Sequence, residues 1–234
     1  MSTLLIVVGL GLGVPDAAAT IAKPLFGSQE TRNKNLRPFP KWTGMLERYF
    51  KEQGKKPGPC TAKTFNKCHA DRWAKLVEEQ RGKDLPTQLR AINGFMNESR
   101  YIVDPINWGL KDYWATPNQF FAKYGDCEDY AIAKYLTLKR LGVAPDKLRI
   151  VVLQDLNLRL AHAVLAVYTD DRIIILDNQI KQTVDASAIR HYRPIFYINE
   201  DAWWLHRPSG QARATSARPR PKVKRRKIRR RRRR

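Results

Sequence analysis

The sequence G-D-C-E-D-Y-A at residues 125–131 places a single cysteine at the start of a predicted helix. Asp126 is a typical N-cap residue, and the helical pattern runs from Cys127 to Leu141 before Gly142 ends it. At the first helical position, free backbone N–H groups and the positive end of the helix dipole favour a thiolate. The same N–H groups could stabilise an oxyanion on an attacked carbonyl. Cys127 is therefore a candidate nucleophile.

Helical patterns precede this helix and strand patterns follow it. Helices are expected at residues 42–53, 67–81, 85–98, 117–123 and 127–141, and strands at residues 148–153, 159–168, 172–178 and 194–198. Helices followed by strands indicate an α+β fold, with the nucleophile helix packed on a mostly antiparallel sheet. With 234 residues and 43% apolar content, the chain can bury one sizeable core.

Two further residues, His162 and Asp177, lie in neighbouring predicted strands. If Thr169-Asp170 forms a two-residue hairpin loop, the two side chains are directly opposed, with Cβ atoms about 5 Å apart. If Asp170-Asp171 forms the loop, they are diagonal neighbours about 7–8 Å apart. Both registers put them on one sheet face, where Asp177 can hold one imidazole nitrogen while the other faces Cys127.

Cys127, His162 and Asp177 together match what a thiol nucleophile needs, namely a base and a group that orients the base. Each residue alone also fits an ordinary structural role, as a small buried side chain, a core histidine or a turn residue. Their shared geometry favours catalysis. His191 is a rival base, but it lacks an acidic partner in a paired strand. The apolar residues of the same face are expected to pack against the helix: Val164, Ala166, Ile173 and Ile175.

Three carboxylates surround the candidate nucleophile: Asp126, Glu128 and Asp129. Acidic residues are common in the first turn of a helix, where the dipole favours them. They also raise the pKa of a neighbouring thiol. A hard divalent cation, in particular calcium, would neutralise that effect, although the sequence contains no EF-hand spacing. The sequence leaves both interpretations open.

The two ends of the chain differ from its middle. Residues 1–19 contain an apolar run and three alanines, which predicts a secretory signal and a periplasmic location; an apolar arm on a cytoplasmic protein is the alternative. Residues 20–40 are expected to form an extended arm, and residues 41–207 one domain. Residues 208–234 are expected to be disordered. Of the net charge of +22, 14 units lie beyond residue 212, which leaves +8 (22 − 14) elsewhere.

Cys60 and Cys68 lie eight residues apart in a segment rich in Pro, Gly and Lys. In an oxidising compartment they could close a disulfide. A zinc site with His69 is the alternative, although no second ligand pair of the usual spacing exists. The disulfide would leave Cys127 as an unpaired thiol.

Several motifs resemble those of the bacterial transglutaminase-like cysteine proteinases, and in particular the LapG-type periplasmic proteases. The motifs are W-A-T-P (114–117), G-D-C-E-D-Y-A-I-A-K-Y (125–135), L-R-I (148–150), H-A-V-L-A-V-Y (162–168) and L-D-N (176–178). Two features depart from the family. Ala163 stands where a methionine is frequent, and the arginine-rich tail is not part of the family pattern.

The resemblance implies a papain/transglutaminase-like core with a triad of Cys127, His162 and Asp177. It also implies a calcium site formed by Asp126 and Glu128, with Asp129 as a further ligand. The implied activity is removal of the N-terminal region of a large surface adhesin, which disperses biofilm. An inner-membrane cyclic-di-GMP receptor is the implied regulatory partner.

Two other functions fit the same sequence. The site could transfer the acyl group to an amine, as a transglutaminase or amidase does, because the triad does not decide whether water or amine enters. The protein could instead be a non-enzymatic binder whose basic tail contacts anionic lipid or a cell-wall polymer. Specific binding to nucleic acid is not expected of an exported protein.

Overall fold

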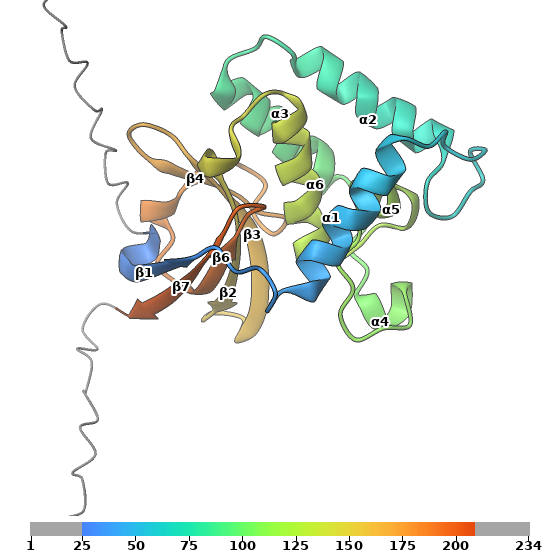
Figure 1. Ribbon diagram of the computed structural model, residues 1–234. Helices are drawn as coiled ribbons and strands as arrows, with labels where there is room; N and C mark the ends of the chain where they lie inside the picture. Colours follow the sequence, from blue (N-terminus) through green and yellow to red (C-terminus); the bar gives the residue numbers. More distant parts are fainter. Residues whose placement is uncertain (1–24, 209–234) are drawn as a thin grey trace, which may run out of the picture.

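The computed structural model describes residues 25–208, and the predicted signal peptide and arginine-rich tail lie outside them. Helices gather on one side of a seven-stranded sheet (Figure 1). The helices are α1 (Pro40–Gln53), α2 (Lys67–Gln80), α3 (Leu85–Asn97), α4 (Asp104–Asn107), α5 (Pro117–Lys123) and α6 (Cys127–Arg140). The strands are β1 (Ser28–Asn33), β2 (Leu148–Asp155), β3 (Leu160–Tyr168), β4 (Ile173–Leu176), β5 (Val184–Asp185), β6 (Tyr192–Ile198) and β7 (Trp203–Pro208).

The sheet is antiparallel throughout, in the order β1-β7-β6-β2-β3-β4-β5. This arrangement confirms the α+β fold predicted from the order of helices and strands. Strands β1, β5 and β7 were not expected. β1 lies inside the segment predicted as an extended arm, and it pairs with β7 from Ser28↔Pro208 to Asn33↔Trp203. This part of the arm is therefore an edge strand of the sheet.

Helix α6 carries the candidate nucleophile and runs through the centre of the molecule. Its residues from Asp129 to Leu138 are all buried, so this helix is covered on every side. It packs mainly against β3 and α3. Gly142, with φ of +92°, supplies the left-handed conformation just after the helix end, as the sequence indicated. The burial of α6 fixes its N-terminus firmly beside the sheet.

Two apolar clusters lie on the two faces of the sheet. The helix-side cluster joins α6 to alternate strand residues, including Leu165, Val167 and Leu176. Val164, Ala166, Ile173 and Ile175 belong to the other cluster, with Tyr192, so the expectation that they face the helix was wrong. Side chains alternate along a strand, and here Leu165 and Val167 of β3 face α6.

The β3–β4 hairpin uses the second of the two predicted registers. Leu165 pairs with Leu176, and the Thr169 N–H donates to the Arg172 carbonyl oxygen over 2.9 Å. The loop is therefore Asp170-Asp171, and direct opposition of His162 and Asp177 is ruled out. β4 ends at Leu176, so Asp177 is the first residue of the following loop.

Cys60 and Cys68 form a disulfide, with Cα atoms 5.1 Å apart. The bond joins the loop after α1 to the first turn of α2. Cys127 is a free thiol. Among residues 25–208, none of the helices has both the length and the apolar character needed to cross a bilayer.

Candidate active site

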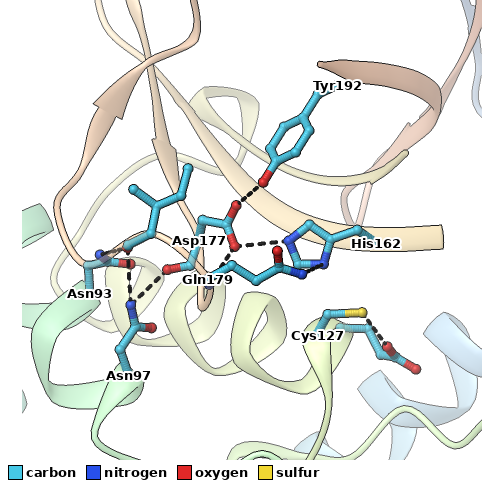
Figure 2. Close-up of polar contacts among 9 residues, drawn as sticks. Asn93, Asn97, Cys127, His162, Asp177, Gln179 and Tyr192 are labelled. Atoms are coloured by element: carbon cyan, nitrogen blue, oxygen red, sulfur yellow. Dashed lines mark hydrogen bonds and ion pairs between the residues drawn. The ribbon is translucent and has the colours of Figure 1, made fainter. Parts of the chain in front are cut away.

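His162 and Asp177 are in direct contact. His162 Nε2 lies 2.9 Å from Asp177 Oδ1, and both side chains are almost fully buried. The Tyr192 hydroxyl donates to Asp177 Oδ2 over 2.6 Å, and the Gln179 backbone N–H donates to Oδ1 over 2.8 Å (Figure 2). Burial disfavours the carboxylate, but the hydrogen bonds and the imidazole outweigh it and lower the pKa of Asp177. Asp177 is therefore ionised and holds the His162 ring at Nε2. The other ring nitrogen, Nδ1, is left to act on a different group.

Helix α3 holds the loop that carries Asp177. The Asn97 side-chain amide donates to the Asp177 backbone carbonyl over 2.7 Å. One turn earlier, Asn93 donates to the Lys181 carbonyl over 3.1 Å. Figure 2 shows both side chains reaching the loop from helix α3. Because β4 ends before Asp177, these side chains take over from the sheet in fixing the position of the carboxylate.

Cys127 lies on the Nδ1 side of the His162 ring, away from Asp177 (Figure 2). The backbone of Ala163, the residue after His162, acts to lower the pKa of the thiol and so favours the thiolate. The thiol itself donates to Glu128 Oε2 over 3.3 Å. The Gln179 side-chain amide lies 3.4 Å from His162 Nδ1. In this arrangement sulfur and Nδ1 have different partners, so proton transfer requires rotation of the thiol away from Glu128.

Burial and the carboxylates of Glu128 and Asp126 raise the pKa of Cys127 well above its usual range. Burial and the neighbouring acids likewise raise the pKa of Glu128 to about 10. The helix dipole acts in the opposite direction, but it is too weak to offset this concentration of negative charge. A positive charge nearby would oppose these effects and favour the thiolate.

The acidic cluster contains a residue that the sequence did not reveal. Asp104, the first residue of α4, is 1% exposed, and burial together with neighbouring acids raises its pKa to about 6. Its backbone N–H donates to Asp126 Oδ2 over 3.4 Å. Carboxylate oxygens of Asp104 come within 4.8 Å of two sets of acids: Asp126 with Asp129, and Asp112 with Glu128. Asp104 is thus common to both groups.

Two buried carboxylate oxygens indicate whether the acidic cluster is suited to binding a cation. Asp104 Oδ1 and Asp126 Oδ1 are buried and have no hydrogen-bond partner among the described residues. Unpaired buried carboxylate oxygens are costly, and an all-oxygen set of this kind is what calcium prefers. These residues therefore fit a calcium ion.

Asp129 has a different environment. Its Oδ1 accepts from the Ala115 N–H over 2.7 Å, and its Oδ2 accepts from the Asp126 N–H over 3.4 Å. A Cβ atom at Gly125 would collide with this carboxylate, which explains why a glycine precedes Asp126. Because backbone groups already occupy its oxygens, Asp129 is better suited to fixing the helix start than to binding a cation.

The structure thus brings the predicted residues together as two adjacent groups, His162 with Asp177 and Cys127 with the acids. His191 stacks edge-on against Tyr192, with ring centroids 4.5 Å apart, and Asp177 has His162 as its imidazole partner. Asn97, Asp104 and Tyr192 escaped the sequence analysis because they lie in other elements. The signal that could have pointed to Asn97 is its place one helical turn after another asparagine, Asn93, on the same predicted helix.

A half-buried cysteine at a helix start, next to a His–Asp pair on a sheet, defines a thiol hydrolase with a papain/transglutaminase-like core. The family model described as bacterial transglutaminase-like cysteine proteinase matches residues 59–202. The chain belongs to this family and is a cysteine protease. A search of curated protein sequences found no match.

Solved structures narrow the class further. Calcium-bound LapG of Legionella pneumophila is 34% identical, covers 68% of this chain and 87% of its own, and has a TM-score of 0.56. EGTA-treated LapG from the same organism is 33% identical over 70% of this chain and 86% of its own, with a TM-score of 0.55. The chain is therefore a cysteine protease of the LapG type.

Proposed function

We propose that this protein is a periplasmic endopeptidase that acts through a Cys127–His162–Asp177 triad. The observation that carries the proposal is the Asp177–His162 hydrogen bond, because it fixes the imidazole with Nδ1 directed to the side of Cys127. His162 takes the thiol proton at Nδ1 as Cys127 attacks the peptide carbonyl. The same nitrogen then protonates the leaving amine, and water releases the acyl group from the sulfur.

Asp104, Asp126 and Glu128 are the proposed calcium ligands, with Asp129 fixing the loop that presents them. A bound calcium ion would supply the positive charge that offsets these carboxylates. With Glu128 engaged as a ligand, the hydrogen bond from Cys127 to Glu128 is weakened. The thiol is then free to turn towards Nδ1 of His162. The unpaired oxygens of Asp104 and Asp126 support this assignment.

The proposed substrate is the N-terminal region of a large surface adhesin, whose cleavage releases the adhesin and disperses biofilm. Membership of the LapG type supports this substrate, and sequestration by an inner-membrane cyclic-di-GMP receptor is proposed on the same ground. Periplasmic location is supported by the apolar run near residue 1 and by the Cys60–Cys68 disulfide, which forms in oxidising compartments. The basic tail is proposed to contact anionic lipid or cell-wall polymer.

Cleavage of a candidate adhesin tests the proposal. The mature protein is incubated with the N-terminal region of an adhesin encoded beside its gene, with calcium, with a chelator, and as Cys127→Ala with calcium. We expect a discrete cleavage product in the first reaction alone. Equal cleavage with chelator would show that the metal is not needed for the reaction. Cleavage by Cys127→Ala would show that Cys127 is not the nucleophile. Cross-linked product without hydrolysis would instead indicate acyl transfer to an amine.

A further inference from the structure

One edge of strand β3 is open beside the active site. β3 pairs with β4 only as far as Leu165↔Leu176, because β4 ends there. The first half of β3, residues 160–164, continues past that end and keeps β2 as its neighbour on the other side. The loop after β4 turns towards α3, where the Asn97 side chain holds its first carbonyl. Within residues 25–208, no strand pairs with this edge of residues 160–164.

The β3–β4 hairpin determines which backbone groups point to the open edge. The Thr169 N–H donates to the Arg172 carbonyl oxygen, so Thr169 directs its backbone groups towards the β4 side. In an antiparallel ladder this direction alternates along the strand, and the N–H and C=O of one residue point the same way. The odd-numbered residues of β3 therefore direct both groups to that side. Ala161, which is exposed, offers one donor and one acceptor at the open edge.

The open edge leads directly to the proposed general base. Ala161 is followed in the chain by His162, whose imidazole is bonded to Asp177. Cys127 lies on the Nδ1 side of that imidazole (Figure 2). Extended peptides commonly bind proteins by adding a strand to an exposed sheet edge. A peptide that pairs with Ala161 therefore passes beside the thiol.

Three exposed leucines lie at the same end of β3. They occupy alternate positions in the β2–β3 turn and at the start of β3, and the exposed fractions are 42% for Leu156, 53% for Leu158 and 62% for Leu160. Leu160 and His162 lie on one face of the sheet, because side chains alternate along a strand. A single exposed leucine is ordinary, but three beside an active site form an apolar contact surface.

We propose that the edge of β3 at Ala161 binds the polypeptide substrate as an additional strand, with Leu158 and Leu160 receiving one of its aliphatic side chains. This binding mode rests on the endopeptidase function proposed above. The occupant is an extended peptide, because the chain is a cysteine protease and the edge ends at its proposed base. Backbone pairing at Ala161 serves any sequence, whereas the leucines select substrates with an aliphatic residue at the contact.

Amide hydrogen exchange, followed by NMR, tests the open edge. In the free protein the Ala161 amide should exchange quickly, whereas the Val164 amide, which points to β2, should be protected. In Cys127→Ala with the N-terminal region of the adhesin bound, exchange at Ala161 should slow about tenfold or more. Slow exchange at Ala161 in the free protein, or exchange unaffected by bound adhesin, would overturn the proposal.

Substitution of the leucines tests the apolar surface. In the double variant Leu158→Asn with Leu160→Asn, KM for the adhesin region should rise about tenfold or more while kcat stays within about threefold. Alkylation of Cys127 by iodoacetamide should be unchanged, since this small reagent does not need the surface. Both leucines are exposed, so their replacement leaves the core intact.

The matched control is Phe50→Asn, which replaces an exposed apolar side chain of α1 and should leave KM unchanged. An unchanged KM in the double variant would overturn the proposal. Sedimentation identifies the other possible occupant of the edge, a second copy of the chain. A wild-type dimer that the double variant abolishes without any change in KM would assign the edge to self-association.

A peptide pool separates this proposal from the proposed adhesin substrate. If the adhesin region is not cleaved, a peptic digest of unfolded casein takes its place, and protection of Cys127 from iodoacetamide is measured. We expect the digest to slow alkylation of wild type, and to slow that of the double variant about fivefold less. Equal protection of both proteins, or protection of neither, would overturn the proposed surface. Protection of wild type alone, with the adhesin uncleaved, would overturn only the proposed substrate.

Discussion

The two halves of the active site differ in how completely their polar groups are paired. On the sheet side, Asp177 accepts hydrogen bonds from three groups and has a lowered pKa. On the helix side, one carboxylate oxygen of Asp104 and one of Asp126 lack a hydrogen-bond partner within residues 25–208, and the pKa of Cys127 is raised. The fold therefore orients the base, whereas we propose that an added positive charge completes the nucleophile half of the site. This difference is the one expected of a folded protease whose proposed activation depends on a bound cation.

The largest effect is expected on the sheet side, from Asp177→Asn. An amide at this position would favour the wrong imidazole tautomer, so we expect kcat to fall by about 10²–10⁴. Calcium affinity, measured by calorimetry, should stay within a few fold of wild type because the acidic cluster is unchanged. A loss of calcium affinity comparable to the loss of kcat would show that the sheet side and the helix side of the active site depend on each other.

The same variant carries a pH signature. The folded-state pKa of Asp177 is lowered from its ordinary 3.8, so its contribution to stability is present above that value and is lost as pH falls below it. Asp177→Asn should therefore flatten the loss of thermal stability below about pH 4. An unchanged acid profile in unfolding scans would contradict the lowered pKa.

A smaller effect is expected on the helix side, from Asp104→Asn. Removing one ligand charge should weaken calcium binding about tenfold or more, with activity regained at high calcium. The matched control is Asp112→Asn, an exposed carboxylate that pairs with Lys41. If Asp112→Asn weakens binding more than Asp104→Asn, the ion sits nearer the outer group of acids than we infer.

Asn97→Ala tests the hydrogen bond by which α3 holds the loop that carries Asp177. Losing the 2.7 Å hydrogen bond should cost about 1–2 kcal/mol of stability and lower kcat about three- to tenfold. Asn93→Ala, which releases the same loop at Lys181, should cost similar stability with less effect on kcat. Equal effects of both variants on kcat would indicate general loosening of the loop.

The smallest effect is expected from Tyr192→Phe. The variant removes one of the hydrogen bonds to Asp177 while the others remain. We expect a loss of about 1 kcal/mol in urea unfolding and a two- to threefold decrease in kcat. A decrease as large as that of Asp177→Asn would mean that Tyr192 takes part in the reaction itself.

Local signals in the sequence were sufficient for most of the fold and for the three proposed triad residues. The cap at Asp126, the stop at Gly142 and the apolar run of β3 are determined by neighbours along the chain. For the hairpin between β3 and β4, the sequence allowed two pairing registers. The Thr169–Arg172 hydrogen bond selects between them, and this choice depends on the three-dimensional context.

Long-range contacts explain what the sequence did not reveal. β1 has the polar sequence S-Q-E-T-R-N, and it is a strand because it pairs with β7 and because Glu30 pairs with Arg149 over 3.0 Å. Asp104 lies 22 residues before Asp126 in a segment with no regular pattern. Asn97 and Tyr192 reach Asp177 from α3 and β6. No spacing rule brings such residues together before the fold is known.

The reactivity of one sulfur atom tests the account most directly. With Cys60 and Cys68 in a disulfide, Cys127 is the only free thiol of the three cysteines, so alkylation of the native protein reports on it alone. We predict that calcium accelerates this alkylation about tenfold or more at neutral pH, and that a chelator reverses the gain. Equal alkylation rates with calcium and with chelator would contradict the claim that the nucleophile half of the site depends on a cation.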